Sequence, residues 1–288
     1  MSINIKKLLL ILLFLFVKQV KAQNENKDSE HIKEMSKEFL NPLSDIWSLQ
    51  IQNDFAFLSG DAISGNRKAN YTNIQPIMPI PLGDKWNLIN RPLIPYVILE
   101  TPQQNGSYKN ERGLGDIELI QVISPSKGLG FFNLIGGGVT WIFPTATNSV
   151  IGSEQWSVGP TFGMGRVDDH VMFGFIAQQN WSLGGQKNSV DINRFKLQYF
   201  LKYRLSSTFN IGISPIIVAN WDRDSSNRWS VPIGFGFGST TKIGRLPVNL
   251  SYEIHHYEKS PEFIGAQWNF RFTLTTGIMN PLKQELNN

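Results

Sequence analysis

Residues 194–205 read RFKLQYFLKYRL, a stretch in which apolar and polar side chains alternate. The six odd-numbered positions from Phe195 to Leu205 are all apolar or aromatic, whereas the even-numbered positions carry four basic residues and one glutamine. Successive side chains of a β-strand point to opposite faces, so this period of two predicts a strand with one apolar and one polar face. Its length is about twice that of an average globular strand and matches a tilted strand that crosses a membrane.

The same alternation recurs in three later stretches, at residues 228–238, 248–256 and 268–276. Their apolar faces carry Trp, Tyr and Phe near the segment ends, as do the aromatic girdles of membrane β-barrels. Together with the turn residues, the alternation predicts twelve strands, or ten or fourteen if a bulged strand has been split. The twelve segments are 46–58, 70–82, 85–100, 113–124, 130–145, 155–166, 170–183, 191–205, 209–222, 228–242, 247–258 and 262–279.

The connections between these segments alternate in length. Links after odd-numbered segments, such as residues 101–112 and 146–154, are longer and polar, whereas residues 83–84 and 167–169 form tight turns. Outer-membrane barrels have long extracellular loops and short periplasmic turns. A sheet can cross a bilayer only by closing, because no backbone polar group can face lipid unpaired. The expected fold class is therefore an all-β, antiparallel up-and-down transmembrane β-barrel of about twelve strands.

The first residues have the pattern of a secretory signal peptide at residues 1–22. Lys6 and Lys7 precede an apolar run over residues 8–17, and Ala22 ends a suitable cleavage site; this order of regions is typical of exported proteins. The run is too short to cross a bilayer as a helix, which takes about 20 apolar residues. Together with the barrel pattern, the signal predicts export to the cell outer membrane.

The chain after the signal peptide divides into three parts. Residues 23–45 form a predicted helical segment, in which Ile32 and Met35 recur near the helical period. This segment either caps the lumen from the periplasmic side or lies outside the barrel. The barrel itself is expected over residues 46–279, and a polar C-terminal tail over residues 280–288.

The polar faces of the predicted strands are expected to line the lumen. The candidate lumen-lining residues are Asp54, Arg91, Asp116, Glu118, Arg194, Lys196, Lys202, Arg204, Glu253 and Arg271. One hypothesis is a charged pore that selects solutes. The other is a packed lumen that holds a narrow barrel shut, since charges in a low-dielectric interior must be paired whether or not anything passes.

Catalysis, cofactor binding and metal binding are not predicted. His256 is expected to face outward, but the preceding strand offers no outward hydroxyl to complete a lipid-facing hydrolase site. Ser251 and His255 share the inward face about 13 Å apart along a strand, too far to hydrogen-bond. Residues 222–227 begin like a calcium loop but lack the glycine and glutamate that such a loop needs. The net charge of +4 is not gathered into basic blocks, so no nucleic-acid partner is expected.

Several motifs together resemble a known family. They are NIQPIMPIP (73–81), KWNLINRPLIP (85–95), GLGDI (113–117), FPTAT (143–147), GSEQW (152–156) and WSVP (229–232). The chain resembles, over about residues 40–275, the Gram-negative outer-membrane transporter barrels grouped with proteins of the meta-pathway of phenol degradation. This resemblance implies outer-membrane lipid and the barrel assembly machinery as partners. It also implies uptake of small aromatic or hydrophobic solutes.

The sequence therefore predicts a barrel for passive uptake or transport of a small-molecule solute, with no enzyme activity. The alternative is a structural or surface-interaction barrel with a blocked lumen, whose outer loops carry the function. The solute, the gate and the oligomeric state are not set by the sequence.

Overall fold

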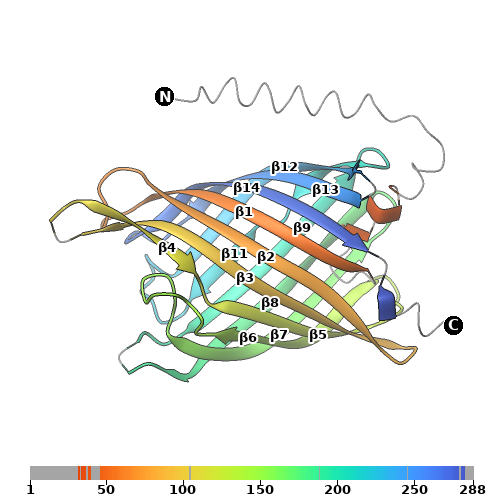
Figure 1. Ribbon diagram of the computed structural model, residues 1–288, viewed down its shortest axis with the longest axis horizontal. Coiled ribbons are helices and arrows are strands. Elements are labelled where there is room, and N and C mark those ends of the chain that lie inside the picture. Colours follow the sequence, from red (N-terminus) through yellow and green to blue (C-terminus); the bar gives the residue numbers. More distant parts are fainter. Residues whose placement is uncertain are drawn as a thin grey trace.

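The computed structural model of the protein describes residues 46–103, 105–187, 189–244, 246–278 and 280–282, and residues 32, 34–36, 38 and 39. The described residues form fourteen strands that pair antiparallel around a closed sheet (Figure 1). They are β1 (Trp47–Ser59), β2 (Arg67–Leu82), β3 (Trp86–Pro102), β4 (Tyr108–Leu114), β5 (Ile117–Pro125), β6 (Leu134–Phe143), β7 (Gln155–Val167), β8 (Val171–Gly185), β9 (Asn193–Arg204), β10 (Phe209–Ile213), β11 (Ile216–Asn220), β12 (Trp229–Ile243), β13 (Leu246–Lys259) and β14 (Gly265–Ile278). Because β1 pairs with β14, the first strand closes the barrel on the last.

Two pairs of these strands are halves of one interrupted barrel strand. β4 and β5 both pair with β3, and β10 and β11 both pair with β9 and β12. The described strands therefore make a closed barrel of twelve strands, and the predicted fold class and strand count are confirmed.

The predicted segments differ from the structure mainly in three places, and β4 also begins at Tyr108, inside the predicted link 101–112. The segment at 113–124 is interrupted at Gly115 and Asp116, where the Gly115 N–H donates to the carbonyl oxygen of Pro95 at 2.8 Å. The segment at 209–222 is interrupted at Ser214 and Pro215. β6 begins at residue 134 rather than at 130, and residues 126–133 form the link between β5 and β6.

Prolines account for most irregularities of the sheet. The β2–β3 pairing is interrupted where Pro76 and Pro92 lie, and the β7–β8 pairing is interrupted around Pro160. Pro215 lies in the break between β10 and β11, and the β12–β13 register shifts at Pro232. Proline has no N–H to donate to a neighbouring strand, so the ladder opens or bulges where it occurs.

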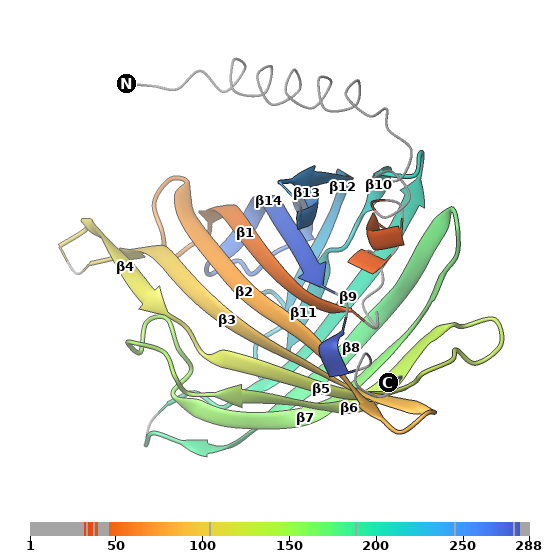
Figure 2. The same ribbon diagram turned by 45° about the vertical axis from the view of Figure 1, so that its right-hand side comes forward.

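The links between strands alternate in length as predicted. At one end of the barrel they contain five to eleven residues, and at the other two to four, apart from the eight-residue link 126–133. We call these the long-loop end and the short-turn end; in Figure 1 they lie at the left and the right. The described helical residues lie at the short-turn end (Figure 2), where Ile32 and Met35 are buried. The segment boundaries predicted at residues 1–22 and 23–45 fall largely outside the described residues.

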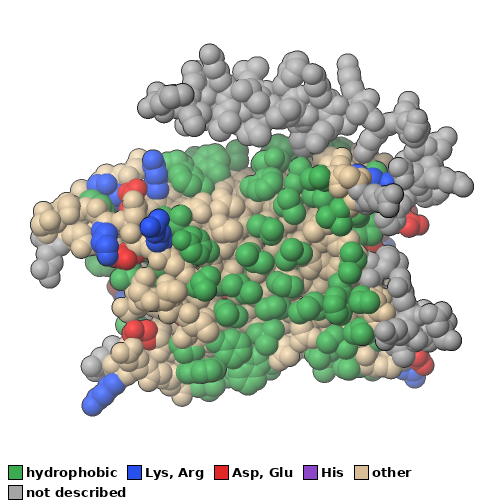
Figure 3. Space-filling model, viewed as in Figure 1, with side chains coloured by type: hydrophobic (Ala, Val, Ile, Leu, Met, Phe, Trp, Pro, Cys, Tyr) green, Lys and Arg blue, Asp and Glu red, His purple; other side chains and the backbone are tan. Residues whose placement is uncertain are grey.

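The outside of the barrel is apolar. Figure 3 shows hydrophobic side chains spread over the wall, with the visible basic and acidic side chains gathered at its two ends. Side chains on the predicted apolar faces are exposed, among them Leu201 at 55%, Phe235 at 60% and Trp268 at 45%. A soluble monomer rarely exposes so large a continuous apolar surface, whereas a membrane barrel requires one. Among the described residues, no helix is long and apolar enough to cross a membrane.

Candidate functional site

The interior of the barrel is polar. Side chains at inward positions, including Thr140, Asn180, Gln75 and His255, are 0–1% exposed. Burying a polar group is costly unless it is hydrogen-bonded. The partners of these side chains therefore determine how the lumen is filled, and many of them fall into three hydrogen-bonded groups.

The first group is a closed ring of hydrogen bonds, which we call the lumen ring. Its six members are Asp54, Ser214, Glu253, His255, Asn269 and Arg271. Arg271 Nε donates to Asp54 Oδ1 at 2.8 Å, and its Nη1 donates to the carbonyl oxygen of Ser214 at 3.0 Å. Asn269 Nδ2 donates to the same Asp54 oxygen at 2.6 Å. β1 and β14 are joined across the lumen face by these bonds as well as by their ladder.

Glu253 closes the ring from β13. Its carboxylate accepts the N–H and the hydroxyl of Ser214, each at 2.8 Å, and lies 2.9 Å from His255 Nε2. His255 Nδ1 lies 3.5 Å from Asn269 Nδ2. Ser214 lies in the break between β10 and β11, so its backbone N–H and carbonyl take no part in the sheet ladder and can bond in the lumen beside its hydroxyl.

The second group, the Glu118 cluster, lies on the opposite wall. Glu118 on β5 forms an ion pair with Lys196 on β9, and Gln178 Nε2 on β8 donates to Glu118 at 2.9 Å. The same Gln178 nitrogen lies 2.8 Å from Thr140 Oγ1 on β6. Glu118, Gln178 and Thr140 are all buried.

The third group lies on β1, β2 and β3, between the strands that carry the other two. On β3, Arg91 donates from Nε and Nη2 to Gln75 Oε1 at 3.0 and 2.6 Å, and from Nη2 to Gln50 Oε1 at 3.4 Å. Arg91 also interacts electrostatically with Glu118 and Arg271. We call the part of the lumen that contains the lumen ring, Arg91 and the Glu118 cluster the constriction. Its buried side chains come from both walls of the barrel.

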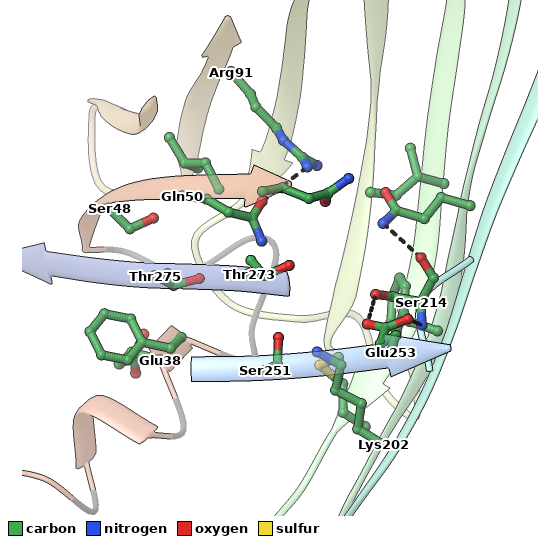
Figure 4. Close-up of a pocket in the computed structure, with 17 residues that line it drawn as sticks. Glu38, Ser48, Gln50, Arg91, Lys202, Ser214, Ser251, Glu253, Thr273 and Thr275 are labelled. Carbon is green, nitrogen blue, oxygen red and sulfur yellow. Dashed lines mark hydrogen bonds between the residues drawn. The ribbon is translucent and has the colours of Figure 1, made fainter. Parts of the chain in front are cut away.

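A cavity of about 90 Å³ lies between the constriction and the short-turn end (Figure 4). Ser48 and Thr275 line it, and both lie nearer the short-turn ends of their strands than the ring members on the same strands. Arg91 and Lys202 approach the cavity from opposite sides in Figure 4. Phe39, one of the described helical residues, also lines the cavity.

Asp116 and Arg194 were both predicted from the sequence, and neither forms a hydrogen bond with the described members of these groups. Asp116 accepts the N–H of Ser153 at 2.7 Å and the N–H of Ala146 at 3.1 Å, so it holds the link 144–154 against the long-loop end. Arg194 is on the inward face of β9, and its Nε is buried without a hydrogen-bond partner among the described residues.

Arg204 lies at the short-turn end of β9. Its Nη1 donates to the carbonyl oxygen of Asp169 at 3.0 Å, in the turn between β7 and β8. In the same turn the N–H groups of Val171 and His170 donate to the Asp168 carboxylate and lower its pKa below the ordinary value. Arg204 therefore braces a turn, and the structure does not join it to the constriction.

His256 has the outward position that the alternation predicts. Its side chain is 39% exposed, its Nδ1 lies 3.1 Å from Glu258, and its ring packs edge-on against Trp268. Its partners in register are Ile233 on β12 and Trp268 on β14, neither of which carries an aliphatic hydroxyl. The described groups of His, Asp and Glu include none arranged to hold a metal ion.

The fold of the described residues is similar to that of a solved outer-membrane barrel. An outer membrane channel from Pseudomonas putida F1 shares 11% sequence identity with this chain. The match covers 82% of this chain and 97% of the channel, with a TM-score of 0.63. The NanC porin shares 11% identity over 80% of this chain and 100% of the porin, with a TM-score of 0.48. A Pseudomonas aeruginosa FadL homologue shares 9% sequence identity over 83% of this chain and 93% of the homologue, with a TM-score of 0.39. No protein-family model and no curated protein sequence matches the chain.

Sequence reasoning missed several members of the constriction. Asn269 and His255 stand on the same inward faces as Arg271 and Glu253, so the alternation already placed them in the lumen. Gln178 is a similar case on β8. The lumen-lining prediction depends on Asp, Glu, Lys and Arg side chains, and these three residues are not of those types. Ser214 had no comparable signal apart from the proline that follows it.

Proposed function

We propose that this protein is an outer-membrane channel through which small solutes pass, with flow limited at the constriction. The observation that carries the proposal is the contrast between an apolar outer wall and a polar lumen that contains a cavity. A barrel that only anchored its loops would have no need of a cavity lined by Arg91 and Lys202. The fold shared with the Pseudomonas putida channel supports this proposal.

The proposed orientation follows from the lengths of the links. In outer-membrane barrels the short turns face the periplasm and the longer loops face outward, so the cavity lies on the periplasmic side of the constriction. The signal peptide at residues 1–22 is part of the same proposal, since a barrel of this kind must be exported before assembly machinery inserts it. Membership of the phenol meta-pathway grouping rests on the motifs quoted above.

The test is the conductance of the refolded full-length mature chain in a planar lipid bilayer. We expect discrete current steps of low conductance, because buried side chains occupy the constriction. Liposome swelling with small neutral sugars and with small organic acids then reports which solutes pass. If neither current steps nor swelling exceed those of protein-free membranes, the channel proposal is wrong.

A structural barrel with a blocked lumen is the second candidate, and the constriction favours it. Asp54, Glu118 and Arg271 are each less than 9% exposed, so the present arrangement leaves little room at that level. This candidate predicts no current from wild-type protein. It also predicts no current from variants in which the lumen ring is broken.

A further inference from the structure

The apolar outer wall of the barrel contains a polar trio on β1 and β2, made of Asn53, Asn70 and Thr72. Asn53 Nδ2 donates to Asn70 Oδ1 at 3.0 Å and to Thr72 Oγ1 at 2.8 Å, and Asn70 Nδ2 donates to Asn53 Oδ1 at 3.1 Å. The trio faces outward, because alternation places it on the same strand faces as Ile51 and Ile74, which are 36% and 42% exposed. Polar side chains at membrane depth are costly and usually mark functional positions. We call these three residues the outer trio.

The outer trio does not use all of its hydrogen-bonding groups. The amide nitrogen of Asn70 carries two N–H groups, and one of them bonds Asn53. No described residue accepts the other. Because a donor without an acceptor is costly in apolar surroundings, a carbonyl or hydroxyl oxygen of a lipid would be stabilised beside Asn70.

An exposed lysine lies on the same face of β2, two positions nearer the long-loop end than Asn70. This residue, Lys68, forms no hydrogen bond and no ion pair with a described residue. On the next strand, the Glu100 carboxylate lies 3.9 Å from an Arg67 nitrogen, which partly balances its charge. Figure 3 shows basic side chains, with some acidic ones, gathered at this end of the wall. The outward face of β2 thus changes from cationic to polar to apolar between Lys68 and Ile74.

Tryptophans mark the outer interface on many of the other strands. Six of the eight lie at or near the long-loop ends of strands from β6 to β14, and these are Trp141, Trp156, Trp181, Trp221, Trp229 and Trp268. The other two are at the short-turn ends of β1 and β3. Tryptophan anchors a barrel wall at the level of the lipid headgroups. The long-loop ends of the described strands β1 to β5 have no tryptophan, and Lys68 there is in register with Phe57, which is in turn the partner of Trp268.

We propose that the outward face of β1 and β2 binds a phosphorylated glycolipid of the outer leaflet. A phosphate group lies at Lys68, the amide and ester linkages of the acyl chains lie at Asn70 and Thr72, and the acyl chains lie against Ile51 and Ile74. Two residues along a tilted strand span about 5 Å of membrane depth, so the order of the side chains matches the order of headgroup, linkage and acyl chain. A free phosphate would match Lys68 but leave the outer trio without a partner. The inference uses the membrane orientation proposed above but does not depend on the channel function.

Native mass spectrometry of the refolded full-length mature chain tests the binding, with lipid A that carries two phosphates as the probe. The micelles contain equal amounts of lipid A and phosphatidylglycerol, and a parallel sample contains lipid A without its phosphates. One phosphorylated lipid A per chain should be retained in preference to phosphatidylglycerol, which supplies charge but no amide linkage, and excess inorganic phosphate should not displace it. Equal retention of phosphatidylglycerol, displacement by phosphate, or no retained lipid A overturns the proposal. A dimer without bound lipid also overturns it, since this wall would then be an interface between copies of the chain.

Two variants assign the contacts. Lys68→Gln should lower the affinity for lipid A about fivefold and remove the preference for the phosphorylated form. Asn70→Leu should lower the retention of both forms, since Asn70 contacts the linkages and not the phosphates; Thr72→Val serves if that variant does not fold. An unchanged preference in Lys68→Gln, or unchanged retention in both trio variants, overturns the assignment.

Matched controls come from the same wall. Lys85→Gln removes an exposed lysine from the β2–β3 turn at the short-turn end. Asn90→Leu breaks a second outward polar pair, in which Gln121 Nε2 donates to Asn90 Oδ1 at 2.9 Å. Both controls should retain lipid A like wild type, and losses equal to those of the site variants would overturn the proposal. Because retention is measured without transport, a barrel that binds lipid A but passes no current keeps this site and loses only the channel function, and a conducting barrel that retains no lipid A does the reverse.

Discussion

Replacing Arg271 by methionine is the sharpest test of the lumen ring. Arg271 is 8% exposed, pairs with Asp54 at 2.8 Å and donates to the Ser214 carbonyl oxygen at 3.0 Å. Asp54 is itself 7% exposed, and without Arg271 its carboxylate would keep, among the described residues, only the amide donors of Asn269 and Gln52, each at 2.6 Å. Removing one partner of a buried ion pair costs about 3–5 kcal/mol, since the remaining charge is uncompensated. The free energy of unfolding should fall by that amount.

The second variant of the cycle is charge-balanced. Asp54→Asn combined with Arg271→Met removes both charges of the pair, so its costs are the lost donor to the Ser214 carbonyl, about 1–3 kcal/mol, and the lost attraction between Arg271 and the nearby Glu253 carboxylate. The double variant should therefore be more stable than Arg271→Met alone. With Asp54→Asn alone as the remaining variant of the cycle, the coupling energy between the two sites should be at least about 2 kcal/mol.

Urea unfolding in detergent micelles, followed by tryptophan fluorescence, measures these free energies where the unfolding and refolding curves overlap. Arg112→Met, which removes an exposed arginine from β4, is the matched control and should change the free energy of unfolding by less than about 0.5 kcal/mol. A cost below about 1 kcal/mol for Arg271→Met, with no gain from adding Asp54→Asn, would refute the reasoning. It would mean that water in the lumen screens the pair as it screens a surface ion pair.

Three further predictions concern other parts of the wall. Lys196→Met should cost about 3–5 kcal/mol in the same unfolding assay, because it leaves the buried Glu118 carboxylate without its cation. Gly138→Ala should reduce the yield of heat-modifiable, folded barrel on gels, since the added Cβ would lie 1.9 Å from a backbone oxygen of β5. Gly137→Ala, whose Cβ meets nothing closer than 4.0 Å, should refold like wild type. Phe235→Arg, at an outward position that is 60% exposed near the middle of β12, should destabilise the barrel in lipid by about 2–4 kcal/mol.

Alternation in the sequence was sufficient to predict the barrel, the number of strands and which side chains face inward. That is because the side-chain period of a strand is fixed by backbone geometry and does not depend on the partner strand. Asp54 and Arg271 are 217 positions apart, yet the alternation predicts that both face inward. Closure of β1 on β14 makes them partners in register. The sequence could not predict that they bond each other, because pairing depends on register, and register is set by long-range contacts.

Breaks in the strands were beyond what alternation can predict. Where a strand is interrupted, the alternation of side chains no longer predicts whether a residue faces the lumen. Asp116 lies in the break between β4 and β5. It therefore bonds to the link 144–154 and takes no part in the constriction. Ser214 is the converse case, because the break before Pro215 turns its backbone into the lumen. A proline marks where a ladder can open, but the sequence does not show which freed group will find a partner.

The lumen ring should have opposite effects on stability and on flow. Its hydrogen bonds hold side chains of β1, β13 and β14 together across the lumen face, so the bonds that stabilise the barrel also narrow it. Asp54→Asn with Arg271→Met removes both charges and breaks the ring without changing its other members. The double variant should therefore raise single-channel conductance while lowering stability, a trade-off between function and stability that is common in proteins. Planar-bilayer recordings beside the Arg112→Met control measure this. If the double variant loses stability but conducts like wild type, the ring only supports the wall and flow is limited elsewhere, with the cavity mouth beside Phe39 as the next position to widen.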